Sequence, residues 1–277
     1  MDNHRDGKLI AVSSMKGGVG KTEVSLNLAV ALKQNTSKRV VVVDFDIPYG
    51  GVSQALKMNK SVSLTDWISI NRDITEVAAN SIVCSHESGI DFIPAIASSN
   101  DQKQLTTKKI TSILTLLRTF YDIVIIDTGV DLSRITKAVL SQSDQVVIVT
   151  SASTVSVWNN HQYKEDLIGI GVDPQRMSLF INQVPRKHSE INVDKIIQVY
   201  ENKGVPVRTA TVAYYDEQIR KLRNKGTFIY SKKSSSDFHE SINELMESIG
   251  LYANINLLSS GSGVFGFMNA IKKVFAR

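Results

Sequence analysis

The chain has 277 residues, of which 42% are hydrophobic and 21% charged, so it is long enough for one substantial α/β domain with a buried core. Its net charge is +5, but residues 251–277 hold +3 of it; the remaining +2 does not indicate a strongly basic nucleic-acid binder. The single Cys84 excludes an intrachain disulfide and a multi-cysteine metal site within one chain. The first residues lack an apolar signal core, and no apolar stretch approaches ~18 residues, so we expect an intracellular protein without a membrane span.

Apolar runs typical of buried strands alternate with helical patterns along most of the chain. Strands are predicted at 9–12, 39–44, 90–94, 122–127, 145–150 and 177–182, and 205–207 is a candidate for a seventh. Helices are predicted near 24–33, 107–119, 132–142, 154–169, 191–202, 215–224 and 237–249. Uninterrupted runs of Val and Ile indicate strands covered on both faces. We therefore predict an α/β fold, a doubly wound, mostly parallel sheet flanked by helices on both faces. One domain is expected over residues 1–250, with a flexible linker at 251–263 and a separate helix at 264–277.

A glycine-rich phosphate-binding loop lies between the first strand and the first helix. Residues 15–22 read Met-Lys-Gly-Gly-Val-Gly-Lys-Thr, whereas the usual pattern G-x-x-x-x-G-K-[ST] would place glycine at Met15. Such a turn directs backbone N–H groups and a helix N-terminus at a phosphate chain. Lys21 would reach the β- and γ-phosphates, and the Thr22 hydroxyl would bind Mg²⁺. The predicted nucleotide-contacting residues here are Lys16, Gly17, Gly18, Val19, Gly20, Lys21, Thr22 and Glu23.

Carboxylates follow two of the predicted strands. Asp44 and Asp46 end the second strand and, by alternation, face the same side. Asp127 ends a strand of four consecutive aliphatic residues, as a Walker B aspartate does. In a parallel sheet these ends meet at the edge from which the phosphate loop leaves. Thr22, Asp44 and Asp127 are therefore the predicted Mg²⁺ site, and the 44/46 pair could also hold the attacking water. The alternative for that pair is a set of solvated acids at a strand end.

An amide ends the sixth predicted strand at Asn182. An amide both donates and accepts, so it can pair with the edge of a purine. The guanine-reading pattern Asn-Lys-x-Asp is absent, which favours adenine and hence ATP as the nucleotide. An amide that only closes a turn is an equally good interpretation of this residue.

In their order and spacing, residues 16–22, 44–46 and 127–129 resemble the deviant Walker A ATPases of the MinD/ParA family, over residues 8–250. The resemblance implies an ATP-dependent homodimer with Mg²⁺, in which Lys16 crosses the interface to the partner's nucleotide. It also implies that Asp46 positions the attacking water and that Asp44 lies near Mg²⁺, so Lys16, Lys21 and Asp46 are the expected catalytic residues.

Three features depart from the family's pattern, one of which is the absence of the proline often seen soon after the Walker B aspartate. Glu23 replaces the threonine that commonly follows Thr22, and an acid there is unfavourable beside phosphate unless its side chain points away. Residues 212–216 resemble the segment that flanks adenine, but the proline commonly found there is missing.

The last residues predict an amphipathic helix, 264–277, behind the Gly/Ser linker 259–263. A helix with an apolar face and a lysine-rich polar face suits the membrane interface, and MinD-like proteins end in a similar tail. The alternative is a helix that docks on the domain or on a protein partner. The predicted membrane-binding residues are Val264, Phe267, Met268, Ile271, Lys272, Lys273, Val274 and Phe275.

These features favour a MinD-like ATPase that attaches reversibly to the inner face of the cell membrane when ATP makes it dimeric. It would position a division, flagellar or pilus apparatus and respond to an activating protein partner that the sequence does not identify. The alternative is a ParA-like partition ATPase that binds DNA nonspecifically, although the small net charge of residues 1–250 makes nucleic acid the weaker prediction.

Overall fold

The computed structural model describes residues 7–48, 50–58, 62–70, 75–96, 98–187, 191–201, 207–228, 230 and 236–251. The predicted membrane-binding helix and all but the first residue of the predicted linker lie outside these residues. Over the described ranges, no helix combines the length and the apolar character needed to cross a bilayer.

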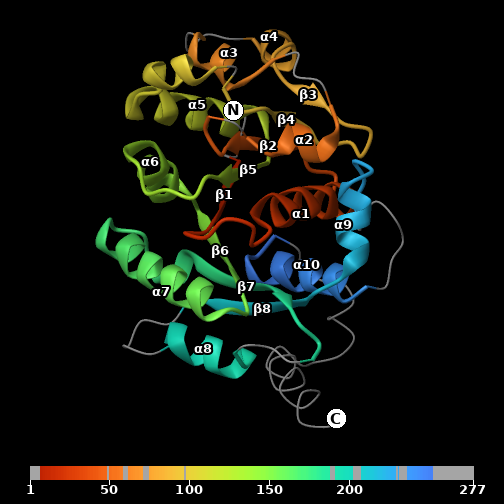
Figure 1. Ribbon diagram of the computed structural model, residues 1–277. Helices are drawn as coiled ribbons and strands as arrows, with labels where there is room; N and C mark the ends of the chain where they lie inside the picture. Colours follow the sequence, from red (N-terminus) through yellow and green to blue (C-terminus); the bar gives the residue numbers. More distant parts are fainter. Residues whose placement is uncertain are drawn as a thin grey trace.

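One sheet runs through the described part of the chain in the order β3-β4-β2-β5-β1-β6-β7-β8 (Figure 1). All neighbours are parallel except β3, which pairs antiparallel with β4. The strands are β1 Lys8–Ser13, β2 Val40–Phe45, β3 Cys84–Ser85, β4 Asp91–Ile93, β5 Ile123–Thr128, β6 Gln145–Ser151, β7 Met177–Val184 and β8 Thr209–Tyr214. The six predicted strands and the doubly wound α/β class are confirmed. The last strand begins at Thr209 rather than within 205–207, and the two-residue β3 is too short to leave a pattern.

The α-helices of the described residues include all seven that the sequence predicts within residues 1–250. They are α1 Lys21–Asn35, α2 Val52–Leu56, α3 Leu64–Ile68, α4 Glu76–Asn80, α5 Thr107–Phe120, α6 Arg134–Gln142, α7 Thr154–Gly169, α8 Val193–Glu201, α9 Glu217–Arg223 and α10 Asp237–Ser248. The short helices α2, α3 and α4 were not predicted, because five residues are too few to show a helical period. Capping gave a local signal for α3: Ser63 and Asp66 form a capping box at its start.

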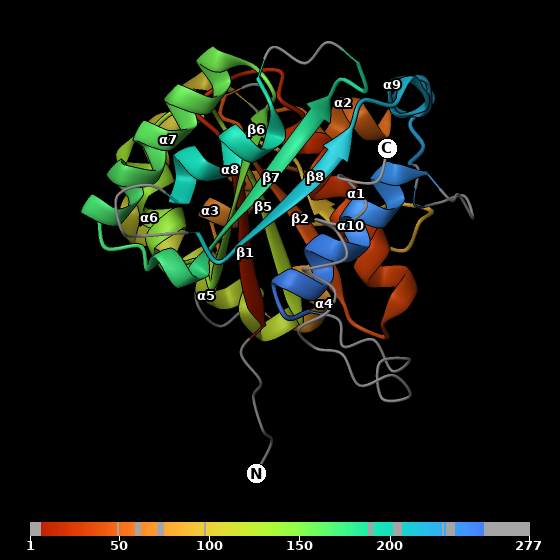
Figure 2. The same cartoon turned by 90° about the horizontal axis from the view of Figure 1, so that it is seen from below.

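Helices cover both faces of the sheet, as Figure 2 shows with α1 and α10 on one side and α6 and α7 on the other. Alternation along β1 divides the core: Leu9 and Ala11 pack into the cluster under α5 and α7, whereas Ile10 and Val12 pack into the cluster under α1 and α10. All four side chains are fully buried. Burial on both faces explains why these strands read as continuous apolar runs.

The centre of the sheet is also where the strand order reverses. β1 pairs with β5 on one side and with β6 on the other. The segment after β1 therefore leaves the sheet at a topological switch point, where a crevice forms beyond the carboxyl ends of the strands.

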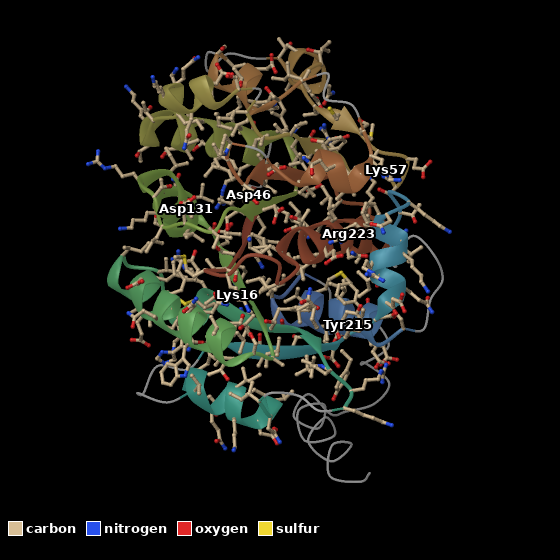
Figure 3. All side chains as sticks on the ribbon, viewed as in Figure 1. Lys16, Asp46, Lys57, Asp131, Tyr215 and Arg223 are labelled. Atoms are coloured by element: carbon tan, nitrogen blue, oxygen red, sulfur yellow. The ribbon has the colours of Figure 1, made fainter. Side chains whose placement is uncertain are left out.

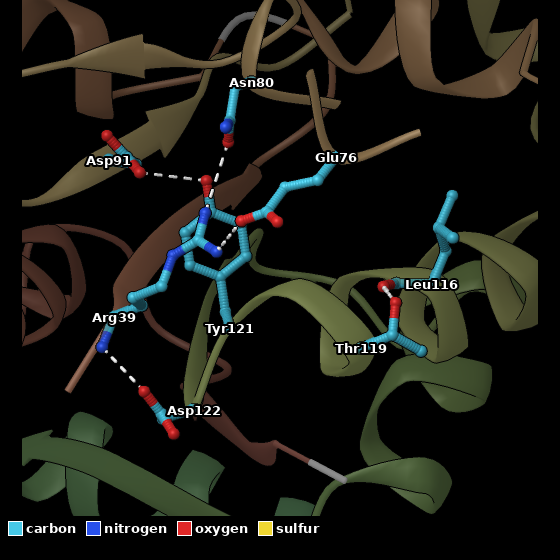
Figure 4. Close-up of polar contacts among 8 residues, drawn as sticks. All are labelled: Arg39, Glu76, Asn80, Asp91, Leu116, Thr119, Tyr121 and Asp122. Carbon is cyan, nitrogen blue, oxygen red and sulfur yellow. Dashed lines mark hydrogen bonds and ion pairs between the residues drawn. The ribbon is translucent and has the colours of Figure 1, made fainter. Parts of the chain in front are cut away.

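A polar cluster at the amino ends of β2, β4 and β5 ties α4 and β4 to the core (Figure 4). The Tyr121 hydroxyl donates to Asp91 over 2.9 Å, and the Arg39 guanidinium lies 5.1 Å from the Tyr121 ring centre. Arg39 also binds Glu76 over 2.5 Å and Asn80 over 3.2 Å. Burial and the neighbouring Asp91 carboxylate raise the pKa of Tyr121, so it remains a neutral donor.

Tyr121→Phe is expected to lower the free energy of unfolding by about 1–2 kcal/mol, because Asp91 loses a donor inside the cluster. Thr119→Ala is the matched control: the Thr119 hydroxyl donates only to its own helix, at Leu116, and the residue is exposed. That change should stay within about 0.5 kcal/mol. Urea unfolding of both variants checks the difference, and equal values would show that the Tyr121 hydroxyl contributes nothing specific.

Candidate active site

The phosphate loop connects β1 to α1 at the switch point. Gly20 ends it with φ +95°, in the left-handed region that glycine adopts freely. A Cβ at Gly20 would lie 2.4 Å from Asn182 Nδ2, so only glycine fits there. No side chain caps α1 at this residue. The first N–H groups of the helix therefore point into the site without a side-chain acceptor, which is the arrangement that binds phosphate.

Helix α7 holds the first arm of the loop. Asn160, fully buried on α7, accepts from the Met15 backbone N–H over 2.8 Å and from the Ser14 hydroxyl over 3.2 Å. Its amide nitrogen donates to the Val149 carbonyl over 3.2 Å. The loop is thus anchored on β6 and α7, which lie more than 130 residues further along the chain, and sequence reasoning did not find Asn160.

The end of β7 holds the second arm. Asn182 donates to the Val19 carbonyl over 2.8 Å, and Gln183 donates to the Gly18 carbonyl over 3.2 Å. Gln183 has φ +56° within a register shift of β7, which turns its side chain toward the loop. Asn182 therefore positions the phosphate loop, and its reading of a purine stays a prediction. Gln183 is a site residue that the sequence did not reveal.

The predicted magnesium site brings α1 and β5 together. Thr22 Oγ1 donates to Asp127 Oδ2 over 2.5 Å, and Ser25 Oγ donates to Asp127 Oδ1 over 3.2 Å. Asp127 and Asp44 are register partners on β5 and β2, and both are buried. Burial raises the pKa of both carboxyl groups; repulsion by Asp44 raises that of Asp127 further, and repulsion by Asp46 raises that of Asp44. Two buried acids beside a hydroxyl present the oxygen ligands that Mg²⁺ takes and a charge that it would offset, so these residues fit that ion.

Asp44 has a second task, which is to shape the loop after β2. Its carboxylate accepts from the backbone N–H groups of Asp46, Gly51 and Val52 over 3.1, 2.8 and 2.9 Å. Gly50 has φ +67°, and a Cβ there would lie 2.4 Å from Asp44 Oδ2. The loop is therefore wrapped closely around this carboxylate, and direct binding of Mg²⁺ by Asp44 stays a prediction.

Asp46 lies at the rim, where the loops after β2 and β5 meet. A Cβ on Gly129 would lie 3.0 Å from Asp46 Oδ1 and 3.3 Å from Asp131 Oδ2. Figure 3 shows Asp46 and Asp131 on the same side of the molecule as Lys16. Asp46 is half-buried, so its carboxylate remains open to water at the edge of the site.

Lys16 is the half-buried second lysine of the loop. Its ammonium donates to the Ser153 hydroxyl over 3.1 Å, and Ser153 is the N-cap residue of α7. The predicted contact of Lys16 across a dimer interface stays a prediction, since one chain cannot display it. The contact with Ser153 is new, because residues 137 positions apart share no sequence signal.

A cavity of about 100 Å³ opens beside the loop, between the ends of β7 and β8 and helix α9. Glu23, in the first turn of α1, lines this cavity. Burial raises the pKa of Glu23 above its ordinary value, and the Arg223 guanidinium opposes only part of this rise. The segment 212–216, predicted to flank adenine, contributes three of the lining residues. The full lining is Glu23, Asn182, Gln183, Tyr214, Tyr215, Asp216, Ile219, Arg220, Arg223 and Phe238.

A parallel sheet with a glycine-rich loop at its switch point, a lysine and a threonine opening the next helix, and an aspartate from a neighbouring strand define a P-loop nucleoside triphosphatase fold. The AAA domain family matches residues 7–165, which is more than half of the chain. The chain belongs to this family, and it shares the fold of ATPases of the MinD/ParA group.

Individual proteins agree with this assignment. An uncharacterised ATP-binding protein of Methanocaldococcus jannaschii is 26% identical over 96% of this chain and 97% of its own length. The ParA family ATPase of Chlorobium tepidum superposes with a TM-score of 0.76 at 22% identity, covering 86% of this chain and 98% of that one. The septum site-determining protein MinD of Pyrococcus horikoshii, solved with Mg-ADP, superposes with a TM-score of 0.72 at 20% identity, covering 90% and 100%. At these identities the two structures establish the fold.

Proposed function

We propose that this protein hydrolyses ATP to ADP and phosphate with Mg²⁺. The observation that carries the proposal is the 2.5 Å hydrogen bond from Thr22 to Asp127, which joins the phosphate loop to the Walker B strand. These two residues would hold Mg²⁺, which supplies charge neutralisation on the phosphate oxygens. Lys21 offsets negative charge at the end of the phosphate chain. The Asp46 carboxylate, open to water at the rim, orients the attacking water. Release of phosphate from Mg-ATP by the purified chain, absent for Asp46→Ala, tests this proposal.

The active form in this proposal is a homodimer that closes around ATP, with Lys16 extended toward the partner's nucleotide. The half-buried position of Lys16 at the mouth of the site supports this role. The acceptor in its bond to Ser153 is an uncharged hydroxyl, whereas a phosphate oxygen carries negative charge. Exchanging this bond for a contact with phosphate is therefore favourable.

The biological role that fits is a MinD-like positioning ATPase. ATP-bound dimers would attach to the inner face of the cell membrane through residues 264–277, and hydrolysis would release them. Two tails on one dimer bind as a unit, whereas a single short helix binds weakly. The structural likeness to a septum site-determining protein supports this role, with a division, flagellar or pilus apparatus as the object positioned and a further protein as activator.

Removal of residues 264–277 is expected to abolish sedimentation with anionic liposomes in ATP and to leave ATP hydrolysis in solution unchanged. The amount of full-length chain that sediments with liposomes should be about tenfold or more greater in ATP than in ADP, because only the dimer engages two tails. Lys272→Ala with Lys273→Ala should weaken binding mainly at low salt, since these lysines contribute electrostatic attraction to lipid headgroups. Equal sedimentation in ATP, ADP and no nucleotide would rule out the switch.

A second candidate is a ParA-like ATPase that binds DNA in its ATP state, favoured by the likeness to a ParA family ATPase. Helix α9 carries basic side chains, but Arg220 and Lys221 pair with Glu217 on the same helix. A patch whose charges are partly offset supports this role less well. Salt-sensitive DNA binding that needs ATP and survives removal of residues 264–277 would favour it.

A further inference from the structure

An ion pair crosses the mouth of the cavity beside the phosphate loop. Glu23 Oε1 lies 3.3 Å from Arg223 Nη1, with Glu23 on the first turn of α1 and Arg223 at the end of α9. The Glu23 side chain is 14% exposed and that of Arg223 is 50% exposed. Figure 3 shows Arg223 beside α9.

The Glu23 carboxylate is directed at the phosphate loop and not away from it. A Cβ on Gly20 would lie 3.2 Å from Glu23 Oε2. Gly20 is the residue from which α1 starts, so this carboxylate competes with a phosphate chain for the same helix N-terminus. An unpaired acid at this place would repel a nucleotide. The condition under which the sequence made this acid harmless, a side chain that points away from the phosphates, is therefore not met.

Arg223 supplies the charge that Glu23 needs. Within the described residues it is the ion-pair partner of Glu23, whereas Arg220 and Lys221 of the same helix bind Glu217. Arg223 also lines the cavity that the segment 212–216 helps to form. One guanidinium thus connects the first turn of α1 with a wall of the cavity.

We propose that Arg223 is a nucleotide-positioning residue that acts through Glu23. Its guanidinium offsets the carboxylate charge beside the phosphate loop, so that a nucleoside di- or triphosphate binds there without net repulsion. This inference rests on the proposed nucleotide-binding function. It follows that loss of Arg223 weakens binding only while Glu23 is present, and weakens it more for the ligand with more phosphate charge.

The test is a double-mutant cycle on the full chain, with the dissociation constants of Mg-ATP and Mg-ADP measured by calorimetry. Arg223→Gln is expected to weaken ATP binding about tenfold and ADP binding less. Glu23→Gln should bind ATP at least as tightly as the wild type. The double variant should return to within about twofold of the wild type, because neither charge remains. Arg223→Lys should keep most of the affinity, since it keeps the cation.

Lys221→Gln is the matched control, because Lys221 lies on the same helix but pairs with Glu217 and does not line the cavity. If Arg223 serves only as a wall of the cavity, the double variant will bind as weakly as Arg223→Gln, and ATP and ADP will lose affinity equally. Either result overturns the inference. A wild-type chain that binds neither nucleotide would instead overturn the proposed function.

Discussion

Lys16→Ala, placed in an Asp46→Ala background, is expected to bind ATP and remain monomeric, whereas Asp46→Ala alone forms a dimer with ATP. Asp46→Ala blocks hydrolysis and therefore holds the ATP state. Lys16 contributes little to its own nucleotide site, because its ammonium rests on Ser153 while Lys21 opens α1 directly behind the loop. Without Lys16, each triphosphate would have one cation fewer beside it, so the repulsion between the two nucleotides across the dimer interface would be less well offset. Removal of such a group costs about 2–5 kcal/mol, a shift of roughly 30-fold or more in the dimer equilibrium.

Analytical ultracentrifugation with ATP, ADP and no nucleotide measures this effect, and calorimetry measures ATP affinity in the same samples. Lys108→Ala is the control, since Lys108 is an exposed lysine in the first turn of α5. In the single variant Lys16→Ala, hydrolysis should fall together with dimerisation. A double variant that dimerises as well as Asp46→Ala would refute the role of Lys16 across the interface.

Asp127→Asn is expected to stabilise the nucleotide-free protein by about 1–3 kcal/mol while abolishing hydrolysis. Asp127 is fully buried next to Asp44; burial raises both folded-state pKa values, and repulsion by Asp44 raises that of Asp127 further. An asparagine oxygen can still accept from Thr22, so the contact survives and the charge is lost. The site is thus strained by the same charges that would hold Mg²⁺.

The pH dependence of unfolding checks the cause. Because the folded-state pKa values are raised, the two carboxyl groups lower the free energy of unfolding least below the ordinary carboxyl pKa of about 4, where both states are protonated. Their destabilising effect grows as the pH rises through the raised values. The gain from Asp127→Asn should therefore be larger at pH 8 than at pH 5 in thermal unfolding with EDTA. A gain that is the same at both pH values would mean that charge is not the cause.

Asp44→Asn is the contrasting variant. Asp44 accepts three backbone N–H groups, and the –NH₂ of asparagine would face at least one of them. The loss of accepted hydrogen bonds opposes the relief of charge, so this variant should gain no stability and should unfold at or below the wild-type temperature. Equal stabilisation by both changes would contradict the view that Asp44 shapes the loop.

Much of the fold follows from local pattern alone. Continuous Val and Ile runs in β2, β5 and β6 predict strands buried on both faces, and the helical periods between them predict crossovers, so the parallel sheet follows. The loop at 15–22 is equally local, because its glycines, Lys21 and Thr22 are neighbours in the chain. Their chemistry can be predicted without knowledge of what packs around them.

The surroundings of that loop were decided only by tertiary structure. Asn160, Gln183 and Arg223 reach it from α7, β7 and α9, across separations that carry no pattern in one sequence. The direction of the Glu23 side chain was likewise open, because one helical position allows several rotamers and only the cavity wall selects among them. Residue type and spacing determined which chemistry this protein carries. Packing of distant segments determined which charges face each other, since electrostatic pairing depends on distance in space and not on distance along the chain.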